Sequence, residues 1–260
     1  MIQAFKMAMK SISGNKFRAF LTMLGIIIGV MALVILVSLV SGATGTVTDT
    51  ISSLGSNLLS VTVSDDKGAP VTLDTLDEWM ADPRIGLAAP SATTTATGKY
   101  SSTTKAVTVY GATPAYAPIN GQTVLLGRFL TQADVENHTS VCIITEKTAE
   151  DMVGYTDCLG EEISLDGRKF TVVGILKNDD ESLTGILTKN SMIAYIPYTT
   201  LMRLSATVSS AITSFSVSAP EGGNMAATES AMKRLLLDRF EDDEDAFSLL
   251  SQNMLEDAMS

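Results

Sequence analysis

The stretch that decides how this chain is organised is AFLTMLGIIIGVMALVILVSLV, from Ala19 to Val40. It has 22 residues and no charged side chain, and Thr22 and Ser38 are its polar residues. At a rise of about 1.5 Å per residue an α-helix of this length extends about 33 Å, and a bilayer core is about 30 Å thick. Both polar side chains can bond to the backbone of their own helix. The stretch is therefore predicted to be a transmembrane helix.

Charge is distributed unevenly around this stretch. Lys6, Lys10, Lys16 and Arg18 precede it, with no acidic residue among them. Of 18 basic and 29 acidic residues in the chain, 14 basic and all 29 acidic ones follow, a net charge of −15. Because basic residues favour the cytoplasmic side, residues 1–18 are expected to be a cytoplasmic amphipathic segment on the membrane lipids, and the acidic body is expected outside. The acidic balance also argues against nucleic acid as a partner.

Two questions about this stretch stay open: whether it is retained as an anchor, and whether its glycines pack against another helix. A cleaved signal peptide is the alternative to an anchor, but its apolar region usually has about 7–15 residues, which favours a retained anchor in the cell (inner) membrane. Gly25 and Gly29 form a small-xxx-small pair, through which two helices can approach closely. Since glycine is common in membrane helices generally, the pair is a candidate for helix packing.

The body after residue 40 has the pattern of a mixed α and β protein. Residues 41–56 are expected to be a stalk. Strands are predicted at 57–63, 105–110, 140–145, 192–197, 212–217 and 246–250, with a strand pair within 91–104 and a hairpin at 162–176 through Asp166-Gly167. Helices are predicted at 73–80, with Asp74, Asp77 and Glu78 at the helix start, and at 146–153, 199–204 and 225–240. Strands and helices on both sides of a middle block indicate one subdomain split by an insertion.

No residues in the sequence are spaced for catalysis. His138 is the single histidine, and a lone loop histidine completes no Ser–His or Cys–His pair. The sequence contains no P-loop, HExxH or GxSxG motif. The acidic run Glu241 to Asp245 lacks the glycine and the spacing of a calcium loop, so it is expected to be a solvated loop. The chain is predicted to be a non-enzyme with no cofactor or metal of its own.

Cys142 and Cys158 are the two cysteines of the chain. Both are expected outside the membrane, where disulfides persist, and a bridge between them would close a short loop worth about 3 kcal/mol. The alternative is a buried free Cys142 and an exposed Cys158. A candidate disulfide and two free thiols therefore both stay open.

Six stretches together resemble a known family. In chain order they are RAFLTMLGIIIGV, LGSNLLSV, VYGATPAYAPING, LLGRFLTQADV, VCIITEKTAEDMVG and CLGEEISLDGRKFTVVGIL. Their order and content, over almost the whole chain, resemble the start of MacB-type ABC transporter permeases of the MacB/FtsX superfamily. The resemblance implies an α+β fold, in which one N-terminal transmembrane helix precedes a two-lobed periplasmic core domain.

The resemblance also implies boundaries for the two lobes. A porter-like α+β lobe would comprise residues 57–120 and 207–260, and an inserted second lobe would comprise residues 121–206. Gly127, Arg128 and Phe129 match the GRF segment of the family and are expected to be structural. The inserted lobe agrees with the split subdomain that the element order indicates.

The functional expectation follows from the same resemblance. It is a permease subunit of a MacB-like exporter, or its amino-terminal part, whose outer domain moves in response to a partner ABC ATPase that binds the ATP. Further permease helices or a second copy of the chain would be the other partners. Such permeases normally carry three more membrane helices after the core domain, so a truncated, split or complete gene product all stay open. The alternative function is a single-span anchored binding or sensor domain without transport.

Overall fold

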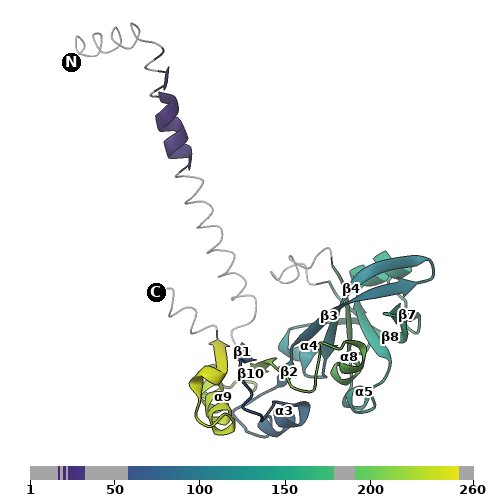
Figure 1. The fold of residues 1–260 in the computed structure, drawn as a ribbon. Coiled ribbons are helices and arrows are strands. Elements are labelled where there is room, and N and C mark those ends of the chain that lie inside the picture. Colours follow the sequence, from purple (N-terminus) through teal and green to yellow (C-terminus); the bar gives the residue numbers. More distant parts are fainter. Residues whose placement is uncertain (1–16, 18–19, 22, 33–57, 179–190, 252–260) are drawn as a thin grey trace. The chain divides into compact units, whose positions relative to one another are not determined.

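The computed structural model describes residues 17, 20–21, 23–32, 58–178 and 191–251, in two units, residues 1–49 and 50–260. In the first unit the described residues from 20 to 32 are helical (Figure 1), and their large apolar side chains are exposed. Among the described residues, no helix combines the length and the apolar character needed to cross a membrane. The described residues do not include the 41–56 stalk. They include Phe17 from the 1–18 segment, and within the expected 19–40 span they leave out residues 19, 22 and 33–40.

The second unit contains strands and short helices. The strands are β1 (Leu58–Val63), β2 (Ala88–Pro90), β3 (Ala92–Tyr100), β4 (Thr103–Ala112), β5 (Val124–Gly127), β6 (Val141–Thr145), β7 (Glu162–Leu165), β8 (Arg168–Leu176), β9 (Met192–Pro197), β10 (Ser214–Ser218) and β11 (Phe247–Ser251). The helices are α3 (Leu73–Trp79), α4 (Tyr116–Ile119), α5 (Gln132–Glu136), α6 (Glu146–Thr148), α8 (Tyr198–Leu204) and α9 (Met225–Arg239), with a π-helical turn at Ala149–Val153 and a 3-10 turn at Glu244–Ala246.

The small lobe is a four-stranded sheet in the order β11-β1-β10-β2, all antiparallel, together with α3 and α9. Alternate residues of β1 point inward, so Leu59 and Val61 are fully buried. Trp79 of α3 is buried and packs against Phe215 of β10 with ring centroids 5.9 Å apart. Asn224 caps α9 by accepting a hydrogen bond from the amide of Ala226. The small lobe thus has its own apolar core between the sheet and its two helices.

The large lobe is a seven-stranded sheet in the order β5-β8-β6-β9-β4-β3-β7. Strand pairs β4–β9 and β6–β8 are parallel and the other pairs are antiparallel. Because β7 pairs with β3 on one edge and with β8 on the other, the chain of pairings closes on itself. The ring encloses a core that includes Val107, Ile144, Phe170 and Ile196, all at most 1 % exposed.

The hairpin from β7 to β8 confirms the turn predicted at Asp166-Gly167. Both residues have positive φ, 46° and 83°, as a two-residue hairpin turn of the primed type requires. The Asp166 carboxylate also accepts a hydrogen bond from the amide of Thr97 at 2.7 Å. The turn therefore joins β7 and β8 and links them to β3.

The change from one lobe to the other does not coincide with the boundary expected at 120/121. Strands β3 and β4, within residues 92–112, pair in the sheet of the large lobe. The Ser91 amide still donates to the Ser214 carbonyl of the small sheet, and the next residue begins β3. No turn marks this change in the sequence, because one extended segment continues from β2 into β3. The chain returns between Leu204 and Ser214, an interval that contains the expected boundary at 206/207.

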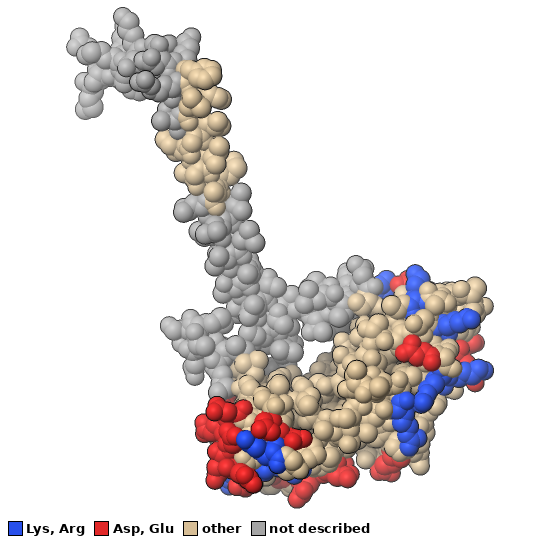
Figure 2. Space-filling view, in the orientation of Figure 1, with Lys and Arg blue, Asp and Glu red and all other residues tan. Residues whose placement is uncertain are grey.

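Acidic residues gather over the small lobe (Figure 2), and the run Glu241 to Asp245 lies there after α9. Lys67 pairs with Asp243 at 2.7 Å and with Asp65 at 3.2 Å, and Lys233 pairs with Glu244 at 2.8 Å. In the part of the chain that the structure describes, no group of three or more His, Cys, Asp or Glu could hold a metal ion. The run is the solvated loop that its sequence predicts.

Gly127 is predicted to be irreplaceable for steric reasons. It has φ +75°, and a Cβ there would overlap the carbonyl oxygen of Val173. Gly121 also has positive φ, +62°, but a Cβ there would meet nothing within 4 Å. We expect Gly121→Ala to lower the free energy of unfolding by about 1 kcal/mol and Gly127→Ala to lower it by about 3 kcal/mol or more.

Chemical denaturation of the full chain, followed by the fluorescence of Trp79, measures both values. Equal losses for the two variants would contradict the steric explanation, since the two glycines differ in their surroundings and not in the sign of φ.

Candidate functional site

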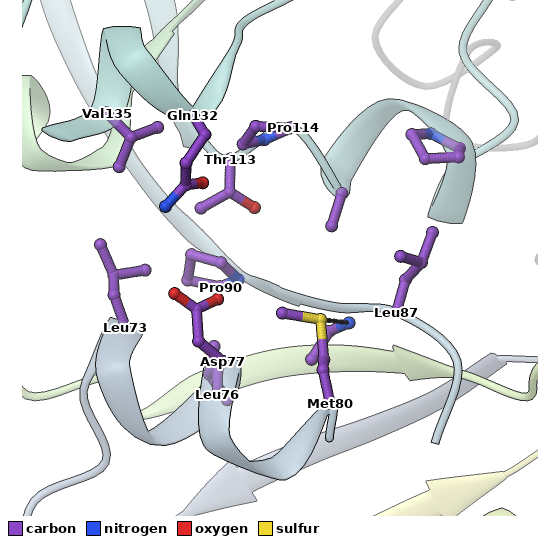
Figure 3. Close-up of a pocket in the computed structure, with 13 residues that line it drawn as sticks. Leu73, Leu76, Asp77, Met80, Leu87, Pro90, Thr113, Pro114, Gln132 and Val135 are labelled. Atoms are coloured by element: carbon purple, nitrogen blue, oxygen red, sulfur yellow. Dashed lines mark hydrogen bonds between the residues drawn. The ribbon is translucent and has the colours of Figure 1, made fainter. Parts of the chain in front are cut away.

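A cavity of about 300 Å³ lies where the two lobes meet (Figure 3). Ten of the thirteen residues that line it are apolar or proline, and the three polar ones are Asp77, Thr113 and Gln132. The apolar residues are Leu73, Leu76, Met80, Leu87, Ala88, Pro90, Pro114, Ala115, Pro118 and Val135. A concave, mostly apolar cavity with a few polar groups is the usual form of a small-molecule site.

Helix α3 forms one wall of the cavity. Thr72 and Thr75 make a reciprocal capping box at its start, which sets where the helix begins. Leu73, Leu76, Asp77 and Met80 then follow at spacings of three and four, so they share one face. The Sδ atom of Met80 accepts a hydrogen bond from the Ala88 amide at 3.2 Å, which ties this wall to β2.

The opposite wall is formed by α4 with the loop before it and by α5. Helix α5 is held by Asp134, whose side chain is 7 % exposed. Arg128 donates to both carboxylate oxygens of Asp134, at 2.6 and 3.2 Å, and the Thr131 backbone amide and hydroxyl and the Thr139 hydroxyl donate to it as well. This arrangement places Val135 of α5 against the cavity. The GRF segment thus has the structural role that was predicted, because Arg128 positions α5.

Two polar groups of the cavity have unusual surroundings. Asp77 is an exposed residue, and partial burial of its carboxyl raises the pKa, which the negative charges of Asp74 and Glu136 raise further. The hydroxyl oxygen of Thr113 is buried and has no hydrogen-bond partner in the described part of the chain. Figure 3 shows the Asp77 carboxylate and the Gln132 amide pointing toward each other from opposite walls. The site therefore offers apolar surface and a few polar groups for binding.

The residues predicted from the sequence lie elsewhere. Gly25 and Gly29 are exposed on the described helical segment, and an added Cβ at either would meet nothing within 4 Å. Lys6, Lys10, Lys16 and Arg18 lie outside the described residues. His138 is partly buried with φ 51° and its Nδ1 atom has no hydrogen-bond partner among the described residues.

Cys142 and Cys158 are both free, so the candidate disulfide is not formed in the structure. The alternative of two free thiols is correct for the buried Cys142 and wrong in expecting an exposed Cys158, which is 1 % exposed and shares the large-lobe core with Cys142. Burial raises the pKa of both thiols. The Gly160 amide donates a hydrogen bond to the Val172 carbonyl of β8, and Cys158 and Val172 belong to the same buried cluster, a long-range packing that the sequence does not reveal.

The sequence analysis predicted the helix at 73–80 and missed the opposite wall. It assigned Asp77 to the helix start, but Asp77 is the fifth residue of α3 and faces the cavity. The Thr131–Asp134 pair has the spacing of a capping box, and this signal could have located α5. Neither the helical pattern of 73–80 nor this capping box predicts that α5 faces α3.

The comparisons with known proteins agree with this architecture. A family model described as the MacB-like periplasmic core domain matches residues 19–235. The chain belongs to this family. The macrolide export ATP-binding/permease protein MacB of Neisseria gonorrhoeae is 27 % identical over 242 residues, which are 90 % of this chain and 37 % of that protein. A MacB protein of Paracoccus denitrificans with the same description is 30 % identical over 206 residues, 76 % of this chain and 30 % of that protein.

Two solved structures show the same fold. The periplasmic region of MacB from Actinobacillus actinomycetemcomitans has a TM-score of 0.66 at 18 % identity and covers 80 % of this chain and 95 % of that one. The extracellular domain of the noncanonic ABC-type transporter YknZ from Gram-positive bacteria has a TM-score of 0.59 at 20 % identity and covers 75 % of this chain and all of that one. The MacB-like chain thus spans about a third of the length of the curated relatives that it matches.

Asp134 is predicted to stabilise the fold in a pH-dependent way. Burial by itself would raise the pKa of its carboxyl, but hydrogen bonds from Arg128, Thr131 and Thr139 outweigh burial and lower the pKa. A lowered pKa in the folded state means that this stability is present above the unfolded value, about 4, and is lost as the pH falls toward the folded value. We expect Asp134→Asn to lower the free energy of unfolding by about 2 kcal/mol at pH 7.

The measurement is denaturation of the full chain at several pH values between 7 and about 3. The difference between wild type and Asp134→Asn should shrink as the pH falls. Asp151→Asn is the matched control, because Asp151 is in an exposed pair with Lys147 and should change stability by less than about 0.5 kcal/mol. A difference that stays constant with pH would show that the charge of Asp134 does not stabilise the fold.

Proposed function

We propose that this chain is a permease subunit, or the amino-terminal part of one, of a MacB-like ABC exporter. Its two-lobed domain lies outside the cytoplasm and moves in response to a partner ATPase. The observation that carries the proposal is the family match over residues 19–235, which runs from the apolar stretch into the two-lobed domain. The curated relatives are described as ATP-binding/permease proteins, whereas this sequence contains no P-loop. These two facts support a partner ATPase as the site of ATP binding, with this region acting as the permease component and without a cofactor or enzymatic activity of its own as part of the proposal.

The membrane anchor is the second element of the proposal. Residues 19–40 span the membrane once, with the N-terminus in the cytoplasm, because the stretch has no charge and four basic residues precede it. Its described part supports this placement, since side chains such as Phe20, Met23 and Ile26 are 61–65 % exposed and need an apolar environment. Gly25 and Gly29 have open space beside them and would let another permease helix, or that of a second copy, approach closely.

The exporter assignment is tested by co-purification of the full chain from native membranes in a mild detergent. We expect an ABC ATPase and further permease helices to be recovered with it. Gly25→Leu combined with Gly29→Leu should reduce the recovered permease partner several-fold, because the bulky side chains hold the helices apart. Ile27→Leu combined with Met31→Leu, one turn apart on another face, is the matched control and should leave the recovery unchanged.

Recovery of neither an ATPase nor another permease segment would overturn the exporter assignment. It would leave the single-span anchored binding or sensor domain as the function, since that function uses the same outer domain without ATP.

The topology is tested with a cysteine introduced on each side of the membrane. Ser101 is an exposed residue in the turn between β3 and β4, and Ser11 lies in the basic N-terminal segment. We expect a membrane-impermeant maleimide to label Ser101→Cys in intact cells and Ser11→Cys only after permeabilisation. The wild type should not be labelled in either case, because Cys142 and Cys158 are buried thiols. Labelling of Ser11→Cys in intact cells would reverse the proposed orientation.

A further inference from the structure

The cavity between the lobes is a concave apolar surface that faces water at its mouth. On its walls Leu73 and Met80 are half-buried and Leu87 is exposed. Covering exposed apolar surface of this kind with an apolar molecule is favourable, because it removes that surface from water. At the packing density of protein interiors, a cavity of about 300 Å³ holds a group of about a dozen non-hydrogen atoms. A ligand of this size is far smaller than a macrolide.

The charge at the cavity has one sign. Asp77 lies in the wall, and Asp74 and Glu136 are close enough to act on its charge. None of the thirteen lining residues is basic. Among the described residues, no ion pair or hydrogen bond joins the Asp77 carboxylate to another side chain. Asp77 is itself an exposed residue, so a cation that pairs with it would displace water and no protein partner.

The accessible polar groups of the cavity match the donors of an ammonium group in type. An ammonium carries three N–H donors. Figure 3 places the Asp77 carboxylate and the Gln132 amide near one end of the cavity, and each has an oxygen that can accept a hydrogen bond, whereas the Thr113 hydroxyl oxygen is buried within the wall. The remaining walls are apolar. A carboxylate acceptor gives the strongest of these bonds, because its charge assists the hydrogen bond.

We propose that this cavity binds a small amphipathic cation, an apolar group of about a dozen non-hydrogen atoms with one ammonium that pairs with Asp77. The apolar part lies against Leu73, Met80 and Val135, between α3 and α5. Because these helices belong to different lobes, the bound ligand contacts both lobes at once. The inference concerns the cavity alone and does not rest on transport or on an ATPase partner.

The test uses three probes of nearly equal size and different charge, which are phenylbutylamine, phenylbutanol and phenylbutyrate. The full chain is labelled with carbon-13 at its methionine methyl groups and placed in phosphatidylcholine nanodiscs. The Met80 methyl resonance, assigned with Met80→Leu, reports on the cavity. The Met232 methyl is the internal reference, because Met232 is buried in the small-lobe core and does not line the cavity.

We expect phenylbutylamine to shift the Met80 resonance saturably, with a dissociation constant on the order of millimolar for a ligand of this size. It should bind about tenfold more tightly than the alcohol, because a charge-assisted hydrogen bond to Asp77 adds to the apolar contact. The carboxylate should bind more weakly than the alcohol. The Met232 resonance should not move.

Two variants separate the charge of Asp77 from the charge of its surroundings. Asp77→Asn should remove the preference for the amine over the alcohol, whereas Asp74→Asn, on the same helix but outside the cavity, should keep most of it. Unchanged Met232 shifts in both variants show that the fold is intact. Equal binding of amine and alcohol to the wild type, or a preference that survives Asp77→Asn, would overturn the proposal. So would a Met80 resonance that none of the probes shifts.

Discussion

The pairing of β1 on both of its edges is the interaction on which the rest of the domain depends. One edge of β1 pairs with β10 and the other with β11, which lie about 150 and 190 residues later in the chain. Closing such long loops has an entropic cost that grows slowly with length, and burial of Leu59, Val61, Phe215 and Val217 offsets it. The small lobe therefore exists only when both ends of the domain are in place, and the large lobe is inserted between them.

The cavity is a consequence of this insertion. The chain leaves the small sheet at Ser91 and enters the large lobe without a turn, so the end of β2 and the start of the β4–α4 connection come close together. Helix α3 then faces α4 and α5 across the cavity. The Arg128–Asp134 pair sets the position of α5, and a glycine at 127 allows the chain to pass the Val173 carbonyl. The geometry of the cavity thus rests on residues that do not line it.

Local patterns predicted most of the elements and not their assignment to lobes. The alternation in 57–63, the helical spacing in 225–240 and the Asp166-Gly167 turn each appear in the structure as expected. The sequence analysis did not predict β2, β5, α4 or α5, which have three to five residues each and are too short for a periodic pattern. The chain passes into the large sheet at β3, before the predicted 120/121 boundary. The sequence did not show this because strand pairing joins residues that are far apart in the chain. The exposure that the alternative gave Cys158 was wrong for the same reason, since Cys158 packs in a core with residues from other strands of the large sheet.

By itself, the sequence determined the apolar stretch with its basic flank, the α+β class and the family resemblance, because hydropathy, charge and residue order are properties of the chain read in one dimension. The tertiary structure alone decided that β3 and β4 belong to the large lobe, that both cysteines are buried and free, and that Asp77 faces Gln132. Each of these facts depends on which distant segments become neighbours. That choice is made by the summed burial and hydrogen bonding of the whole domain, which no local pattern contains.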